Sequence, residues 1–172
     1  MNTQEKTGYP SIDKPWLKYY SEETLHGEIP KCTMYEYIYD HNKSYLDGIA
    51  LQYFNKKITY KKLFENIRKT ADAFWAQGIR KGDAVTIMSL NTPETIYCIY
   101  ALNYIGAVAN MVYMTLSEEE IVETVRNTDS KMFIFLDVAA EKIRNVVSDM
   151  EKISVLAISP TDSLGFLVQK FS

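Results

Sequence analysis

The chain has 172 residues, of which 47% are hydrophobic, and this is enough apolar material for one domain with a buried core. The formal net charge is −3 and Lys and Glu are evenly scattered, which argues against nucleic acid or an anionic membrane as a partner. No stretch is long and apolar enough to be a transmembrane segment, and the polar first residues lack the apolar core of a signal peptide. We therefore expect a cytoplasmic protein.

Residues 1–32 are predicted to form an N-terminal arm. Met1–Asp13 is polar, which is typical of a mobile terminus. Lys14–Tyr20 is aromatic without periodic continuation, so we expect an extended segment whose rings pack on the domain body. Stacking of these rings on a ligand is the alternative.

Residues 33–158 begin with a helix and a hairpin. Thr33 and Glu36 have the spacing of a capping box, which predicts a helix as far as about Asn42. Ile49–Phe54 is a predicted strand that returns, after a turn at Asn55-Lys56-Lys57, as the short strand Ile58-Thr59.

A regular alternation of helices and strands follows. Thr59, Thr92 and Ser117 are each placed to cap a helix, and Gly78 and Gly106 are placed to end one. The expected elements are helix Tyr60–Gln77, strand Ala84–Met88, helix Pro93–Ile105, strand Ala107–Val112, a helix after the capping box Ser117–Glu120, strand Met132–Leu136, helix Val138–Met150 and strand Ser154–Ile158. Strands separated by single helices form right-handed crossovers. The predicted fold class is therefore α/β, a three-layer αβα domain with a mostly parallel sheet.

The helix Pro93–Ile105 is apolar on nearly all sides, with Glu94 and Asn103 as its strongly polar residues. Such a helix must be covered nearly all round. Either a domain that is missing from this chain contacts it, or its tyrosine hydroxyls face water. The apolar, aromatic tail 159–172 favours a chain that continues into a downstream domain, with a docked C-terminal strand as the alternative.

Motifs for several kinds of chemistry are missing from the sequence. It has no G-x-G-x-x-G after a strand, no G-x-x-x-x-G-K-[ST] and no G-x-S-x-G. The turn Gly78–Asp83 could offer backbone N–H groups to an anion, but it enters a strand instead of opening a helix, which favours a simple tight turn.

Polar residues follow two strands at the edge where open α/β sheets bind ligands. Asp137 holds such a position, but we favour its role as the cap of the next helix over a role in ligand binding. Asn91, Thr92 and Glu94 are open to the same two interpretations.

The cysteines and histidines give no site. Cys32 and Cys98 lack metal-ligand spacing, and His26 and His41 lie outside the regular alternation. We therefore assign no catalytic, cofactor-binding or metal-binding residue.

Five segments, in order, resemble the N-terminal part of the AMP-forming, or adenylate-forming, synthetase family. They are Ile58–Leu63 (L-[TS]-Y-x-E-L, with Lys62 in place of Glu), Gly78–Val85 (G-[VI]-x-x-G-D-x-V), Asn91–Glu94 (N-x-P-E), Leu102–Val108 (L-K-A-G-A-V, departing at Tyr104-Ile105) and Leu116–Ile121 (L-[ST]-x-x-E-[LI]). Lys14–Tyr20 is similar to the entry segment of fatty acyl-CoA synthetases. Val112-Tyr113-Met114 stands where the family usually has a Pro and a small polar pair, so the substrate branch is open.

The resemblance implies a two-step ligase. A carboxylate attacks the α-phosphate of Mg-ATP to give acyl-AMP and pyrophosphate, and coenzyme A then forms the thioester. The family's phosphate loop, Mg-binding Glu and catalytic Lys all lie beyond the region matched here, so the resemblance implies a parent enzyme that uses ATP, Mg and coenzyme A. The fragment itself is expected to be inactive and to bind none of them.

Two hypotheses of different classes follow. The first is the N-terminal subdomain of an acyl-CoA synthetase, whose partners are its own downstream domains and a carboxylic acid. The second is a free-standing, non-enzymatic αβ binding module that uses the tyrosine-rich helix as an interface.

Overall fold

The computed structural model describes residues 7–148, 150 and 153–164, and the chain divides into two compact units, Met1–Lys31 and Cys32–Ser172. The first unit contains the short helices α1 (Pro10–Asp13) and α2 (Glu22–His26) with a 3-10 helix, η1 (Pro15–Tyr19), between them. The expectation of an extended segment at Lys14–Tyr20 is therefore wrong. Lys14 turns the chain with a φ of 42°, and Pro15, whose ring holds φ near the helical value, begins the 3-10 helix.

The second unit opens with helix α3 (Met34–Asn42), and the predicted capping box is confirmed. The Glu36 backbone N–H donates to Thr33 Oγ1 at 3.1 Å, and the Thr33 N–H donates to Glu36 Oε2 at 2.7 Å. Each bond satisfies a backbone donor that the helix itself leaves without a partner.

Strands β1 (Ile49–Tyr53) and β2 (Lys56–Thr59) form the predicted hairpin. Its turn is shorter than expected, because Tyr53 pairs with Lys56 and only Phe54 and Asn55 connect the strands. Phe54 has a φ of 49°, because the two-residue turns that suit β-hairpins, types I′ and II′, need a positive φ at their first central residue.

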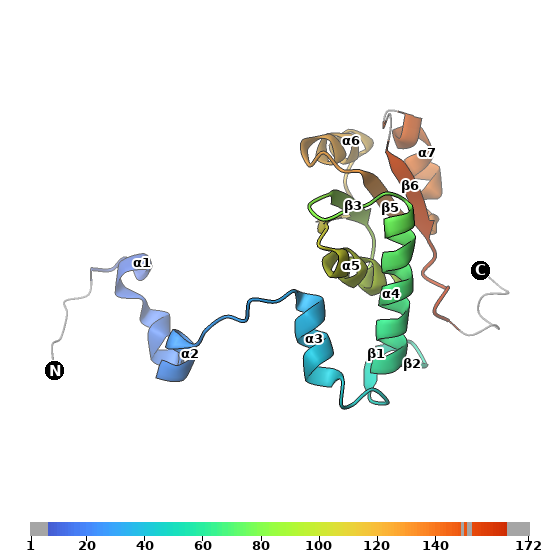
Figure 1. The fold of residues 1–172 in the computed structure, drawn as a ribbon. Coiled ribbons are helices and arrows are strands. Elements are labelled where there is room, and N and C mark those ends of the chain that lie inside the picture. Colours follow the sequence, from blue (N-terminus) through green and yellow to red (C-terminus); the bar gives the residue numbers. More distant parts are fainter. Residues whose placement is uncertain (1–6, 149, 151–152, 165–172) are drawn as a thin grey trace, which may run out of the picture. The chain divides into compact units, whose positions relative to one another are not determined.

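Four strands of the described residues form a parallel sheet in the order β4-β3-β5-β6. They are β3 (Ala84–Met88), β4 (Val108–Val112), β5 (Met132–Leu136) and β6 (Ser154–Ile158). Helices α4 (Tyr60–Ala76) and α5 (Pro93–Ile105) share one apolar core with this sheet, and α6 (Glu118–Asn127) and α7 (Ala140–Ser148) share a second core (Figure 1). Because neighbouring residues of a strand face opposite sides, the two cores lie on opposite faces. The predicted three-layer αβα fold with a parallel sheet is confirmed.

Local signals set the helix ends. Thr59, Thr92 and Ser117 each accept a hydrogen bond from a backbone N–H in the first turn of the helix that follows. Gly78 and Gly106 have φ values of 90° and 77°, which a residue with a side chain rarely adopts, and each stands just past the end of a helix.

Helix α5 is largely covered within its own unit. Helix α4 packs along it, and α3 contacts it through Tyr35, whose N–H donates to Asn103 Oδ1 at 2.8 Å. The Tyr35 ring also meets the Tyr104 ring edge-on, with centroids 4.8 Å apart. The need for a further domain to bury this helix is therefore smaller than its apolar sequence suggested, although Tyr104 remains 48% exposed.

The last predicted helix begins later than expected. A 3-10 turn, η2 (Asp137–Ala139), occupies the first residues of the predicted range Val138–Met150, and α7 follows it. Of the predicted tail 159–172, residues 165–172 lie outside the described residues.

Candidate functional site

The carboxyl edge of the parallel sheet is where its topology favours a ligand. Strand β3 connects through α5 to β4 on one side, whereas β5 connects through α7 to β6 on the other side. In open α/β sheets a crevice forms between two strands whose connections diverge in this way. The residues that follow these strands are Ser89-Leu90-Asn91 and Asp137.

The hydroxyl groups at this edge are used to begin helix α5. Ser89 Oγ lies 2.6 Å from Thr95 Oγ1, which donates to the Leu90 carbonyl at 2.8 Å. Thr92 Oγ1 accepts from the Thr95 N–H at 3.3 Å, so Thr92 is a helix cap. Asn91 is exposed beside this network.

Asp137 is not the helix cap that the sequence favoured. The 3-10 turn that contains it has Leu136 at its N-cap position and makes no side-chain cap hydrogen bond, while the Asp137 side chain is exposed. The reason is local: the turn begins directly at the end of β5, so Asp137 already lies inside it.

The loop at Gly78–Asp83 is a tight turn, as predicted. Asp83 Oδ2 accepts from the Arg80 N–H at 2.7 Å, and Gly82 has a φ of 88°. The Arg80 guanidinium donates to the Trp75 carbonyl at 2.7 Å and lies 4.0 Å from the centre of the Trp75 ring. The Arg80 N–H and guanidinium, which could otherwise contact an anion, are therefore already bonded.

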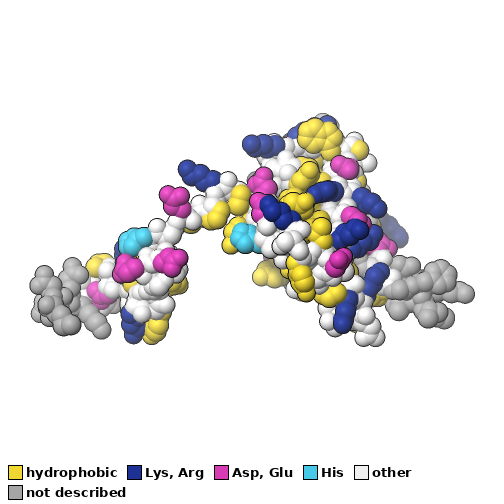
Figure 2. All heavy atoms as spheres, turned by 60° about the horizontal axis from the view of Figure 1, so that its bottom comes forward, with side chains coloured by type: hydrophobic (Ala, Val, Ile, Leu, Met, Phe, Trp, Pro, Cys, Tyr) yellow, Lys and Arg dark blue, Asp and Glu magenta, His cyan; other side chains and the backbone are white. Residues whose placement is uncertain are grey.

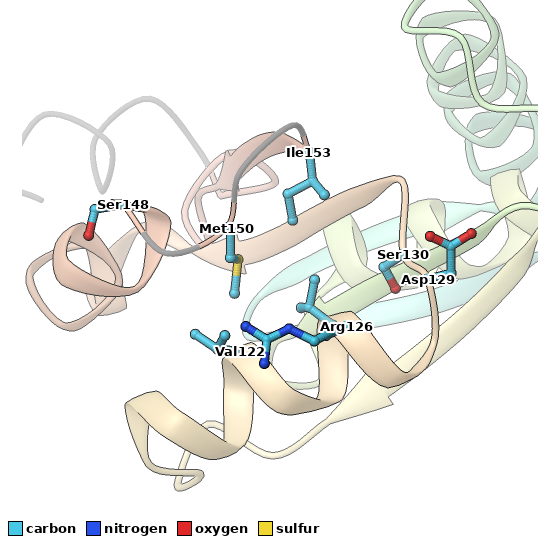
Figure 3. A pocket seen from close by; sticks show the side chains of 8 residues that line it. Val122, Arg126, Asp129, Ser130, Ser148, Met150 and Ile153 are labelled. Atoms are coloured by element: carbon cyan, nitrogen blue, oxygen red, sulfur yellow. The ribbon is translucent and has the colours of Figure 1, made fainter.

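A hollow of about 620 Å³ lies between α6 and the region around Met150. Arg126 extends into it toward Val122 and Met150, whereas Ser148 lies apart on α7 (Figure 3). Ser130 contributes a hydroxyl that already bonds Thr86 and Thr128, each at 2.7 Å. The hollow therefore offers the guanidinium of Arg126 and the carboxylate of Asp129, which pairs with Lys131 at 2.8 Å.

A second hollow, of about 490 Å³, lies between α4, α5 and β6 and contains Glu94. This side chain is only 8% exposed, and neither of its carboxylate oxygens has a hydrogen-bond partner among the described residues. Its place in a helix that is apolar nearly all round was a sequence signal for burial. Its position at the start of the helix, however, indicated a cap or a ligand at the sheet edge.

The surroundings of Cys98 and His41 favour structural roles for these residues. Burial, and then the charge of Glu94, raise the pKa of the Cys98 thiol to about 12, which makes it a poor nucleophile. His41 Nδ1 lies 2.7 Å from the Tyr37 carbonyl in the last turn of α3, and Cys32 is exposed.

Two features are missing from the described residues. Within them, no three or more His, Cys, Asp or Glu side chains gather closely enough to hold a metal ion. In the same part of the chain, no helix has the length and apolar character needed to cross a membrane.

The family model of the AMP-binding enzymes matches residues 38–168, which is most of the chain. The chain belongs to this family. The resemblance found in the five sequence segments is therefore confirmed, and the matched range contains all five.

Sequence relatives of this AMP-binding family member are much longer proteins. A long-chain-fatty-acid–CoA ligase of Bacillus subtilis is 25% identical over 154 residues, which are 89% of this chain and 28% of that protein. An acetyl-coenzyme A synthetase of Brucella canis is 35% identical over 109 residues, which are 60% of this chain and 17% of that protein. The chain thus spans less than a third of the length of these curated relatives.

Solved structures share the fold. An anthranilate CoA ligase in complex with anthranoyl-AMP superposes with a TM-score of 0.70 at 17% identity, over 78% of this chain and 27% of that one. A benzoate CoA ligase from Burkholderia xenovorans also gives a TM-score of 0.70, at 16% identity, over 74% of this chain and 26% of that one. At these identities the likeness establishes the architecture of the αβα unit.

Proposed function

We propose that this chain is the N-terminal subdomain of an ATP-dependent acid–thiol ligase of the acyl-CoA synthetase type. The observation that carries the proposal is the AMP-binding family match over residues 38–168, together with relatives of which the chain spans only 17% to 28%. In the parent enzyme a carboxylate would attack the α-phosphate of ATP, which gives acyl-AMP and releases pyrophosphate. The acyl group would then pass from AMP to coenzyme A. Mg belongs to this proposal as the counter-ion of the phosphates.

The role proposed for this chain is that of a scaffold. Transfer of a nucleotidyl group depends on positive charges and N–H donors arranged around the phosphates. At the carboxyl edge of the sheet the described hydroxyls bond to one another and to the start of α5 instead. We therefore propose that the 172-residue chain has no ligase activity of its own and binds neither ATP nor coenzyme A.

The downstream domains of the parent are the proposed partners. We retain the proposed contact with the helix at residues 93–105, now limited to its Tyr104 end. Further exposed apolar residues lie on β4, at one edge of the sheet formed by the described strands, and just after it, namely Val108, Met111 and Tyr113. A cytoplasmic location and the absence of nucleic-acid binding stay predictions. The second is supported by the mixture of Lys and Arg with Asp and Glu on the face shown in Figure 2.

The alternative of a non-enzymatic module that binds through its tyrosine-rich helix has less support. Tyr97 is buried, Tyr100 is half-buried and α3 contacts Tyr104, so the tyrosine surface that stays exposed is mainly that of Tyr104, at 48%. The coding sequence after Ser172 separates the two hypotheses. A reading frame that continues through a Ser/Thr/Gly-rich phosphate loop supports the ligase, whereas a stop codon at that point supports the module.

Titration calorimetry tests the scaffold role directly. We expect no heat of specific binding when ATP and Mg are added to the 172-residue chain, and no pyrophosphate release with a panel of short, long and aromatic acids. Micromolar affinity for ATP would contradict the scaffold role. The polypeptide extended through its downstream coding sequence should release pyrophosphate with at least one acid of the same panel.

A further inference from the structure

The buried carboxylate of Glu94 leads to an inference that does not depend on the proposed function. Both of its oxygens are buried without a hydrogen-bond partner among the described residues. Its place in the first turn of α5 is favourable for a negative charge, but the helix dipole does not replace the lost hydrogen bonds to water. A buried carboxylate normally has a partner that donates to it.

The hollow next to Glu94 is large enough to hold such a partner. Its volume is about 490 Å³, within the range of small-molecule sites. Its wall contains apolar side chains from α4, β5 and β6, namely Ala73, Phe74, Met132, Leu156 and Ile158. The hollow thus combines the carboxylate of Glu94 with a mainly apolar surface that also contains Lys69, Thr70, Gln77 and Ser154.

This composition favours an organic cation. Divalent cations need several oxygen ligands, and within the described residues no group of three or more acidic, His or Cys side chains gathers at one place. A guanidinium or amidinium ion can instead form two parallel N–H···O bonds with a single carboxylate. Its apolar stem would cover the side chains of the wall.

Among the described residues, no hydrogen bond compensates the buried Glu94 carboxylate. Glu94 contributes, after burial, to raising the pKa of both Cys98 and Tyr53. Lys69 lines the same hollow from α4, but no hydrogen bond joins it to the carboxylate oxygens.

We propose that the hollow between α4, α5 and β6 is a binding site for a monovalent organic cation on an apolar stem, held by Glu94. Two sources share this chemistry: a free amidine or amine, and an Arg side chain presented by a polypeptide.

Benzamidine is a suitable probe, and benzamide is its neutral isostere. In NMR or calorimetric titrations of the 172-residue chain, we expect benzamidine to bind at least about tenfold more tightly than benzamide, because a charge-assisted bidentate pair replaces neutral hydrogen bonds. Glu94→Gln should abolish this preference. Glu65→Gln, the same change at a carboxylate that is partly exposed and paired with Lys62, should leave it unchanged.

A cavity-filling variant keeps the test meaningful if Glu94→Gln fails to fold. Leu156→Trp places a large ring at the wall of the hollow and should abolish benzamidine binding while Glu94 stays intact. Equal binding of benzamidine and benzamide, or a preference that survives Glu94→Gln, would overturn the proposal. Competition with acetyl-Leu-Arg-amide then separates the sources: displacement assigns the site to an Arg side chain, and a lack of displacement assigns it to a free small cation.

Discussion

The two helical layers that flank the sheet differ in how they are covered. On one side, α5 lies between the sheet, α4 and α3, and buries residues along most of its length. On the other side, α6 is strongly amphipathic and buries only Ile121 and Val125 among its residues. Helix α5 is thus an interior helix, whereas α6 is an ordinary surface helix.

The layers also differ in whether their buried polar side chains have hydrogen-bond partners. Under α6, Thr86 Oγ1 bonds Ser130 Oγ at 2.7 Å and accepts from Asn110 Nδ2 at 3.1 Å, while Thr128 Oγ1 bonds Ser130 Oγ at 2.7 Å. Beside α5, the Glu94 carboxylate has no such partners among the described residues. The polar groups under α6 therefore satisfy one another, whereas the α5 layer contains a group suited to an outside partner.

The largest expected effect tests the difference in coverage. Leu102 in α5 is fully buried, so Leu102→Ala should reduce the free energy of unfolding by about 2–5 kcal/mol. Val122 on α6 is only half-buried, and Val122→Ala should cost less than about 1 kcal/mol. Urea unfolding followed by circular dichroism measures both. Equal costs would show that the two layers are equally buried.

The second prediction concerns the buried polar groups of the two layers, whose removal is expected to change the free energy of unfolding in opposite directions. Thr86→Val leaves Ser130 and Asn110 without their shared partner and should reduce stability by about 1–3 kcal/mol. Glu94→Leu removes a buried carboxylate without a partner and should raise stability by about 1 kcal/mol, after the loss of its favourable helix-dipole interaction. The midpoint of thermal unfolding of each variant, at neutral pH and without added amines, provides the comparison. A destabilised Glu94→Leu would mean that the carboxylate has a partner after all.

The smallest effect concerns the exposed start of α6. Hydrogen bonds first from the Ser117 backbone N–H and then from its side chain lower the pKa of Glu120 below its ordinary value of 4.5. The contribution of this carboxylate to stability is therefore complete above pH 4.5 and is lost as the pH falls through the lower folded-state pKa. Ser117→Ala keeps the backbone donor, so NMR titration should show the pKa of Glu120 rising only part of the way back. A full return to the ordinary value would assign the whole shift to the hydroxyl.

Much of this fold was predictable because its signals are local. A cap such as Thr33 with Glu36, or a stop such as Gly106, acts within one helical turn, and strands such as Met132–Leu136 are short apolar runs between such signals. The same locality explains why the five family segments could be recognised. The prediction of an extended segment at Lys14–Tyr20 was wrong because Pro15 favours a helical turn there. The prediction of a cap at Asp137 was wrong by one residue, because the turn begins directly at the end of the strand.

The sequence was therefore sufficient for the order of the helices and strands after residue 33 and for the αβα class, because their signals act between residues near one another in the chain. The same local motifs identified the family, whereas the short helices α1 and α2 were not predicted. The strand order β4-β3-β5-β6, the coverage of α5 by α3, and the isolation of Glu94 were decided by tertiary packing. Asn103 and Glu94 were the two strongly polar residues of one apolar helix, and their surroundings separated them. Asn103 meets a backbone N–H from α3, whereas Glu94 faces a hollow lined mainly by apolar side chains, and the spacing along the helix contains no information about either neighbour.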